Sequence, residues 1–196
     1  MSSNRNTFIR SLHDLGAAAW FGGSLMGALA LNGASQDVSD PTERGTVAAF
    51  GWARWSPVAA AAIGAHLLGG AGLVLVHRDR VRAHRGVTVN TSIKTALTAA
   101  AVASSAYSGV LGGKIADAGT VPTEGATEPS FGTPPDVAKA QQQLRVLQWV
   151  TPVLTGALVV LGAQQGEQQS EQQHPGERIR AWATTAQRHG RQLLPG

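Results

Sequence analysis

The side chains of this chain that are most able to do chemistry belong to three histidines. His66 falls near the middle of a long apolar segment, and His13 and His77 lie at the ends of two such segments. Ionisable side chains are costly in an apolar segment, so each of them is a candidate for a functional role. Two histidines at one depth could ligate a b-type haem. We therefore take His13, His66 and His77 as the candidate cofactor-binding residues.

The spacing of these histidines argues against a shared haem iron. Counted from the start of each predicted helix at about 1.5 Å per residue, His13 and His66 differ in depth by about 15 Å. His13 and His77 share a depth, but His77 lies beside the charged Arg78. We therefore predict no cofactor and keep haem b as the alternative. His66 is interpreted as a neutral imidazole bonded to a hydroxyl or carbonyl on a facing helix, such as that of Tyr107 or Ser104.

Other kinds of site have little support in the composition. The chain has no cysteine, and its two methionines are Met1 and Met26. Disulfides, iron–sulfur clusters and thiolate metal sites are therefore excluded, and a Cu(I) site would lack its soft ligands. The sequence has no nucleophile–base–acid arrangement and no phosphate-binding glycine loop. We predict no catalytic residues, no metal site and no enzymatic activity.

Four stretches without Asp, Glu, Lys or Arg must position these side chains. They cover residues 15–36, 55–77, 95–113 and 146–166. A bilayer core about 30 Å thick needs roughly 20 residues of helix to cross it. We therefore predict an all-α polytopic membrane protein, an antiparallel bundle of four transmembrane helices at about 12–31, 56–77, 93–113 and 144–163. Small residues four positions apart, such as Gly23 and Gly27, would let these helices pack closely.

Positive charge is distributed unevenly over the predicted connections. Most of the 16 Lys and Arg residues lie in the N-terminal arm, the second connection and the tail, whereas the other two connections are rich in Asp and Glu. Because basic residues favour the cytoplasmic side, both termini are predicted to be cytoplasmic, in a multi-pass protein of the cell (plasma) membrane. Trp52, Trp55 and Trp149 then fall at the outer interface, where tryptophan is enriched.

The first predicted span has a competing interpretation, and the third has an unusual composition. A cleaved secretory signal would explain the first span, because Ala28–Leu29–Ala30 resembles a cleavage site. Asp14 and the length of the apolar run argue against cleavage. The third span is the least hydrophobic, so its neighbours should shield it from lipid. Its polar residues are Thr95, Thr98, Ser104, Ser105, Tyr107 and Ser108.

The remaining segments are connections and a tail. We divide the chain into a transmembrane domain, residues 1–166, and a cytoplasmic Gln-rich and basic tail, residues 167–196. The first outer connection is predicted over residues 32–54, as a short segment that is partly helical in character. The second covers residues 112–143, and its prolines and glycines favour an extended, poorly ordered loop. In the tail, residues 177–191 would form either a short interfacial helix or a frayed basic segment.

Several motifs resemble known membrane-protein families. The segment LHDLGAAAWFGGSL (Leu12–Leu25) resembles the opening helix of the copper-resistance protein D-like membrane proteins. The whole chain resembles an uncharacterised actinobacterial four-helix integral membrane protein family, through GWARWSP, AAIGAHLLGG, SAYSG and AQQQLRVLQW. The second resemblance implies a membrane protein of unassigned function. The missing Met and Cys ligands do not fit a copper function.

Three functions remain open at this point. The first is a non-enzymatic accessory or scaffold subunit of a membrane assembly, with the lipid bilayer and either a membrane-protein partner or a second copy as its partners. The second is a haem- or metal-handling protein centred on His66 and His13. The third is a small-solute transporter with a polar path lined by residues such as Ser104 and His66. The basic residues next to the spans would face lipid headgroups, so nucleic acid is not predicted as a partner.

Overall fold

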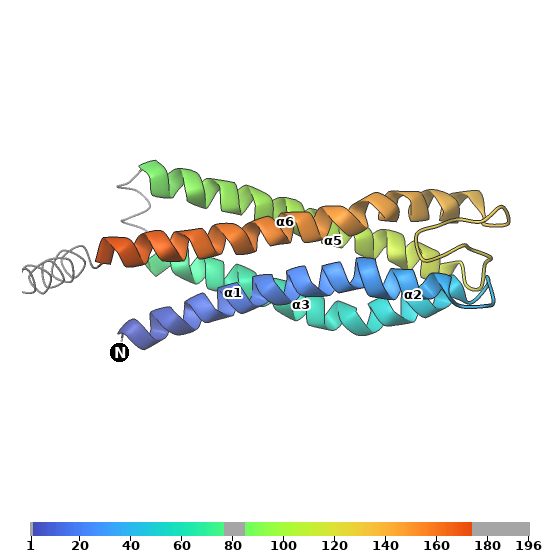
Figure 1. The fold of residues 1–196 in the computed structure, drawn as a ribbon, viewed down its shortest axis with the longest axis horizontal. Coiled ribbons are helices and arrows are strands. Elements are labelled where there is room, and N and C mark those ends of the chain that lie inside the picture. The colour runs from blue at the N-terminus through green and yellow to red at the C-terminus, as the bar shows by residue number, and fades with distance from the viewer. Residues whose placement is uncertain (1, 77–84, 174–196) are drawn as a thin grey trace, which may run out of the picture. The chain divides into compact units, whose positions relative to one another are not determined.

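The computed structural model describes residues 2–76 and 85–173, and long helices dominate both ranges (Figure 1). Two compact units divide the chain, Met1–Val159 and Val160–Gly196. The last helix begins in the first unit and ends in the second. The described elements are α1 (Ser2–Met26), η1 (Gly27–Leu31), α2 (Asn32–Gln36), α3 (Arg44–Val76), α5 (Arg85–Asp117) and α6 (Pro135–Gln173).

The first three elements form one continuous helical rod. At both junctions the backbone stays right-handed helical, with φ −58° and ψ −42° at Met26 and φ −68° and ψ −36° at Asn32. Between them, η1 is a π-helical turn, a bulge that changes the direction in which the following side chains point. The rod continues beyond the predicted span of residues 12–31 at both ends.

The predicted connection between the first two long helices, residues 32–54, is mostly helical, in agreement with its predicted partly helical character. Helix α3 begins at Arg44, so only residues 37–43 link it to α2. Residues 32–36 form α2 and residues 44–54 form the start of α3, so both long helices extend past their predicted spans. The short turn fixes the register of α1 against α3.

Three of the four predicted spans have a counterpart that is long and apolar enough to cross a membrane. Within the described residues these helices are Asn6–Gln36, Arg44–Val76 and Pro135–Gln164. The predicted span at 93–113 lies inside α5, a helix of 33 residues that is not among them. Its serine and threonine residues lower its hydropathy, as the sequence indicated.

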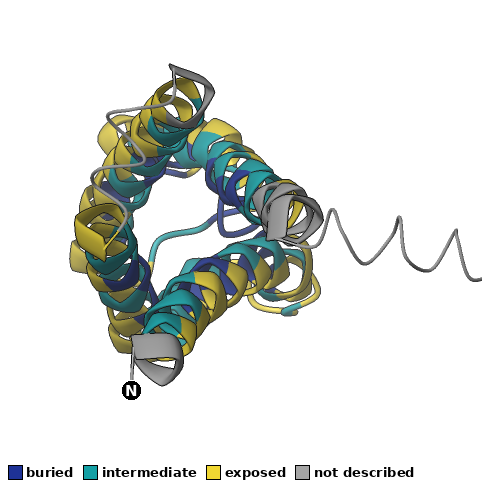
Figure 2. Ribbon diagram, turned by 90° about the vertical axis from the view of Figure 1, so that its left-hand side faces the viewer, coloured by how far each residue is buried: buried dark blue, intermediate teal, exposed yellow. Residues whose placement is uncertain are grey.

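Two clusters of buried side chains hold the helices of the first unit together. Trp20, Ala62 and Ala101 join α1, α3 and α5, with Leu154 of α6 packed against them. Nearer the loops, Leu111 and Ile115 of α5 pack against Val137 and Ala140 of α6. Figure 2 shows the buried residues on the inner sides of the helices and the exposed residues on their outer sides.

The connection between α5 and α6 is ordered by specific contacts, which corrects the prediction of a poorly ordered loop. Gly119 has a positive φ of 70° just after α5, a conformation that favours glycine at a helix end. Further along, Thr123 and Thr127 are buried, at 0% and 3% exposure. The Thr123 N–H donates to the Pro41 carbonyl at 3.0 Å, which ties this loop to the 37–43 turn. We call the end of the bundle formed by residues 37–43 and 118–134 the loop end.

Several predictions fall on residues outside the described ranges. These are His77 as a candidate ligand, Arg78 and its basic neighbours in the second connection, and the interfacial helix of residues 177–191.

Candidate functional site at the α1–α3 contact

Two glycines allow α1 and α3 to touch backbone to backbone. A Cβ atom on Gly16 would lie 2.6 Å from both the Ala62 carbonyl oxygen and the His66 nitrogen. A Cβ on Gly69 would lie 2.6 Å from the His13 nitrogen and 2.7 Å from its Cα. Real Cβ atoms do not approach other atoms so closely, so larger residues at either position would push the helices apart. The two contacts lie on either side of a pair of histidines.

His13 and His66 form a reciprocal pair across this contact. The Nδ1 of His13 lies 2.9 Å from the His66 carbonyl oxygen, and the Nδ1 of His66 lies 3.1 Å from the His13 carbonyl oxygen. A carbonyl oxygen can only accept, so the hydrogen-bond network assigns a proton to both Nδ1 atoms. The two rings are stacked, with centroids 4.0 Å apart and planes inclined by 19°. Each histidine thus binds the backbone of the opposite helix.

The expected offset in depth between His13 and His66 is wrong. The prediction counted residues from helix starts defined by hydropathy, Leu12 for the first helix and Ser56 for the second. The structure instead begins α1 at Ser2 and sets the register of α3 through the 37–43 turn. Because the two helices run antiparallel, His13 and His66 then fall at the same level. Their side chains meet.

The remaining side chains around His66 come from α1 and α5. Its ring is 2% exposed, and its Nε2 lies 3.3 Å from the Thr98 hydroxyl. The Trp20 ring meets it edge-on, with centroids 6.2 Å apart. The predicted kinds of partner, a hydroxyl and a carbonyl of facing helices, are thus present, but Thr98 and His13 supply them instead of Tyr107 and Ser104. Tyr107 instead donates to Gln143 and is 47% exposed.

Ser104, the other predicted partner, lies elsewhere in the bundle interior. It is buried and shares a hydrogen bond of 2.8 Å with Thr151 of α6. Ser105 accepts the Trp20 indole N–H at 3.1 Å. Of the side chains suggested for a polar path, His66 and Ser104 are therefore buried, Ser105 and Ser108 are half-buried, and Tyr107 faces outward.

We expect a double-mutant cycle to detect the Trp20–Ser105 bond. Trp20→Phe keeps most of the ring and removes the donor, and Ser105→Ala removes the acceptor. Their coupling should be about 0.6 kcal/mol, and about 1.7 kcal/mol at most, as for other hydrogen bonds between membrane helices. The free energy of unfolding in detergent micelles measures it. A matched cycle with Ser108→Ala should give no coupling, and equal couplings in the two cycles would contradict this assignment.

The histidine pair does not have the geometry of a haem ligand set. Ligands of one iron must face each other from opposite sides of the macrocycle, whereas these rings are in face-to-face contact at 4.0 Å. Both Nδ1 atoms are engaged by carbonyl oxygens, and the Nε2 of His66 is engaged by Thr98. In the described part of the chain, no three His, Cys, Asp or Glu side chains are grouped so that they could hold a metal ion. His77 lies outside that part.

Charged groups lie near the histidine pair without forming part of the stack. Asp14 and Lys94 are close enough to His66 to act on its charge, and Arg10 and Asp14 are close enough to act on that of Lys94. If both imidazoles were protonated, two like charges about 4 Å apart would repel by about 4 kcal/mol at an effective dielectric constant near 20. The stacked arrangement therefore suits neutral rings or a single cation.

A second group of polar residues, which the sequence analysis did not single out, lies at the loop end. The Asn32 side chain, 5% exposed, donates to Gln148 Oε1 at 2.9 Å and accepts the Trp52 indole N–H at 2.9 Å. It thereby joins α2, α3 and α6. Trp52 was predicted to lie at the lipid interface, but its ring also packs over Gly27, where a Cβ would lie 2.2 Å from the indole. Asn32 reaches this position because it directly follows η1 in the helical rod. The composition of the segment does not reveal that placement.

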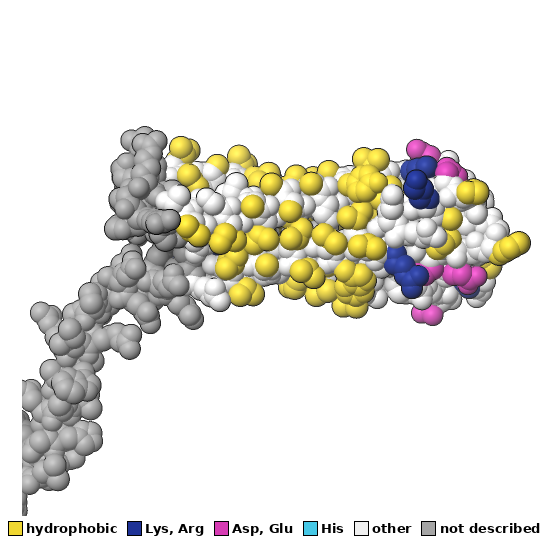
Figure 3. Space-filling view, turned by 90° about the horizontal axis from the view of Figure 1, so that it is seen from above, with side chains coloured by type: hydrophobic (Ala, Val, Ile, Leu, Met, Phe, Trp, Pro, Cys, Tyr) yellow, Lys and Arg dark blue, Asp and Glu magenta, His cyan; other side chains and the backbone are white. Residues whose placement is uncertain are grey.

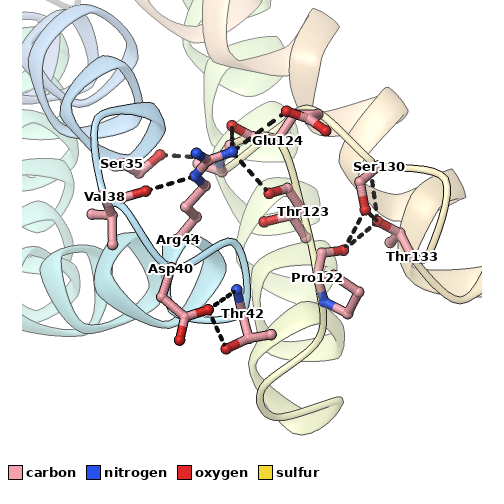
Figure 4. A network of polar contacts seen from close by, with 12 residues as sticks. Ser35, Val38, Asp40, Thr42, Arg44, Pro122, Thr123, Glu124, Ser130 and Thr133 are labelled. Carbon is pink, nitrogen blue, oxygen red and sulfur yellow. Dashed lines mark hydrogen bonds and ion pairs between the residues drawn. The ribbon is translucent and has the colours of Figure 1, made fainter.

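Arg44 connects the two loops of the loop end (Figure 4). Its Nε donates to the Val38 carbonyl at 2.8 Å, and its Nη1 lies 3.4 Å from the Thr123 carbonyl and from a carboxylate oxygen of Glu124. Nearby, hydrogen bonds from the Thr42 hydroxyl and backbone N–H lower the pKa of Asp40. These contacts order the turn and the loop together.

No protein-family model, no curated protein and no solved structure matches this chain. The site must therefore be interpreted from its own geometry.

Proposed function

We propose that the protein is a multi-pass protein of the cell membrane, with both termini cytoplasmic, that acts as a non-enzymatic accessory or scaffold subunit. The membrane assignment rests on the composition of the outer surface of the long helices. Large apolar side chains there are well exposed, including Leu15, Leu29, Leu68 and Val153. Figure 3 shows apolar side chains along the helices and charged ones gathered at the loop end on the face in view. Lipid is the solvent that suits such a surface.

The charges of the loop end support the orientation. Its two loops contain the acidic residues Asp37, Asp40, Glu43, Glu124 and Glu128, of which Glu124 pairs with Arg44 and Glu128 with Arg145. Arg5, Arg10 and Lys94 lie toward the opposite end of their helices. By the positive-inside rule, the loop end faces outward and the chain termini face the cytoplasm.

The interior of the bundle supports a structural role. Its buried polar groups bind groups on other helices, as Trp20 binds Ser105, Ser104 binds Thr151, and Asn32 binds Gln148. In a bilayer such bonds, together with close packing of small residues, hold helices to one another. These groups are used to maintain the fold.

The outer face of α5 supports contact with another membrane protein. Ala99, Ala103, Ala106, Gly109 and Gly113 are all exposed on this helix. A Cβ on Gly109 or Gly113 would meet no atom within 4 Å. A face of small residues lets the backbone of a partner helix approach closely. The partner is thus a transmembrane helix of another subunit or of a second copy.

A pair of glycine substitutions tests this proposal. Gly109→Leu on α5 and Gly22→Leu on α1 both add a side chain in open space, so neither should disturb the fold. We expect Gly109→Leu to remove the membrane proteins, or the second copy, that co-elute with the tagged protein from mild detergent. Gly22→Leu should retain them.

Three results would contradict the proposal. The first is equal co-elution with both variants, and the second is elution of the wild-type protein as a lone monomer. The third is a Soret band or a stoichiometric metal in the purified protein, which would favour the cofactor-handling alternative.

A further inference from the structure

The reciprocal bonds of His13 and His66 leave a single type of nitrogen able to take up a proton. Both Nδ1 atoms donate to backbone carbonyls of the opposite helix. A proton can therefore enter only at Nε2. The two Nε2 atoms differ, because that of His66 lies 3.3 Å from the Thr98 hydroxyl in a ring that is 2% exposed.

The Nε2 of His13 is the more accessible of the two. The His13 ring is half-buried, and no hydrogen bond to its Nε2 is present among the residues that the structure describes. Gly70 packs closely against the opposite edge of the ring, since a Cβ there would lie 3.2 Å from His13 Cε1 and Nδ1. The first proton would enter at this atom.

We propose that the His13–His66 pair is a proton-binding site of fixed capacity. It accepts one proton, at the Nε2 of His13, while the rings remain stacked. A second proton would place two cations in face-to-face contact, and the pair then opens. Because each ring also binds the opposite backbone, opening the pair separates α1 from α3 at this level.

The charged groups around the pair come from two helices. Helix α1 contributes Arg10 and Asp14, and α5 contributes Lys94. Helix α3 has no charged side chain after Arg54, and α6 has none between Arg145 and the end of the first unit. Asp14 and Lys94 act with opposite sign on a charge at His66, so these two neighbours partly offset each other. The limit of one proton therefore rests on the stacking of the two rings.

The test combines a proton count with a distance measurement on the full-length protein in lipid nanodiscs. Nitrogen-15 NMR of labelled histidines follows each Nε2 as the pH falls. Nitroxide labels on Phe8→Cys and Leu75→Cys, both at exposed positions of α1 and α3, report the separation of the helices. Labelling is specific because the chain has no cysteine.

We expect His13 to become protonated first, with no change in the distance between the labels. Protonation of His66 should coincide with a shift of that distance to longer values. His13→Asn and His66→Asn keep an N–H donor near the opposite carbonyl and remove one proton acceptor. Each variant should therefore lose the shift in distance while its remaining histidine still titrates.

Three results would overturn the proposal. In the first, both rings become protonated while the distance stays unchanged. In the second, neither ring takes up a proton before the protein unfolds. In the third, the distance shifts equally in the wild type and in both variants, which would assign the effect to Asp14 or another group.

Discussion

Gly69→Ala is expected to lower the free energy of unfolding of the bundle by about 1–3 kcal/mol, the usual cost of overpacking. The added methyl group would meet the backbone nitrogen and Cα of His13 at 2.6 and 2.7 Å. A backbone cannot move aside as a flexible side chain can, so α1 and α3 must separate. Gly69→Leu should abolish the contact and the stacking of His13 on His66.

A second glycine of the same helix provides the control. Gly64 also lies in α3, but a Cβ there would meet no atom within 4 Å. Gly64→Ala should therefore be neutral, or stabilising by up to about 1 kcal/mol, since alanine is the better helix former. Unfolding of both variants in the same detergent micelles gives the comparison. If Gly64→Ala were as damaging as Gly69→Ala, the loss would come from helix propensity and the contact would be misassigned.

Asn32→Ala is the second substitution with a large expected effect. It would remove the partner of both the Trp52 indole N–H and the Gln148 carbonyl oxygen. Leaving a buried polar group without a partner costs about 1–3 kcal/mol. Because Trp52 and Gln148 are only half-buried, their two losses should fall in the lower part of the summed range, roughly 2–4 kcal/mol. Unfolding in micelles measures the loss of stability. Hydrogen exchange of the 118–134 loop should also become faster.

Ser24→Ala is the matched control for this substitution. Ser24 lies in the same rod, and among the described residues its hydroxyl bonds to the Phe21 carbonyl of its own helix at 3.0 Å. Removing the Ser24 hydroxyl should change the free energy of unfolding little, because its hydrogen bond lies within one helical turn and joins no other helix. Similar losses for Ser24→Ala and Asn32→Ala would show that Asn32 does not join the helices.

The long helices could be predicted from the sequence because charge-free apolar segments have few other stable conformations. Each predicted span lies within a described helix, apart from His77 at the end of the second span. The helix ends could not be predicted in this way. Arg44 and Arg54 interrupt the apolar pattern without interrupting the helix, and hydropathy placed the start of the second helix at Ser56 instead of Arg44.

Because the helix ends were predicted wrongly, the contact between His13 and His66 was not predicted either. His13 and His66 were selected as candidates by residue type, since imidazoles are rare in apolar segments. Their juxtaposition depends on the register of α1 against α3, which the 37–43 turn sets. The order of the 118–134 loop was missed for a similar reason. Its composition excludes a regular helix, but it does not reveal that Thr123 and Thr127 have buried positions against the helix ends.

The short turn between α2 and α3 also bears on the order of biosynthesis. All contacts of the first helical hairpin lie within residues 2–76, so they can form before the rest of the chain has been made. In the membrane location proposed above, the polar helix α5 would reach a bilayer that already contains Trp20 and His66, the groups that bind Ser105 and Thr98. The preformed hairpin would then retain a helix too polar to remain in lipid alone.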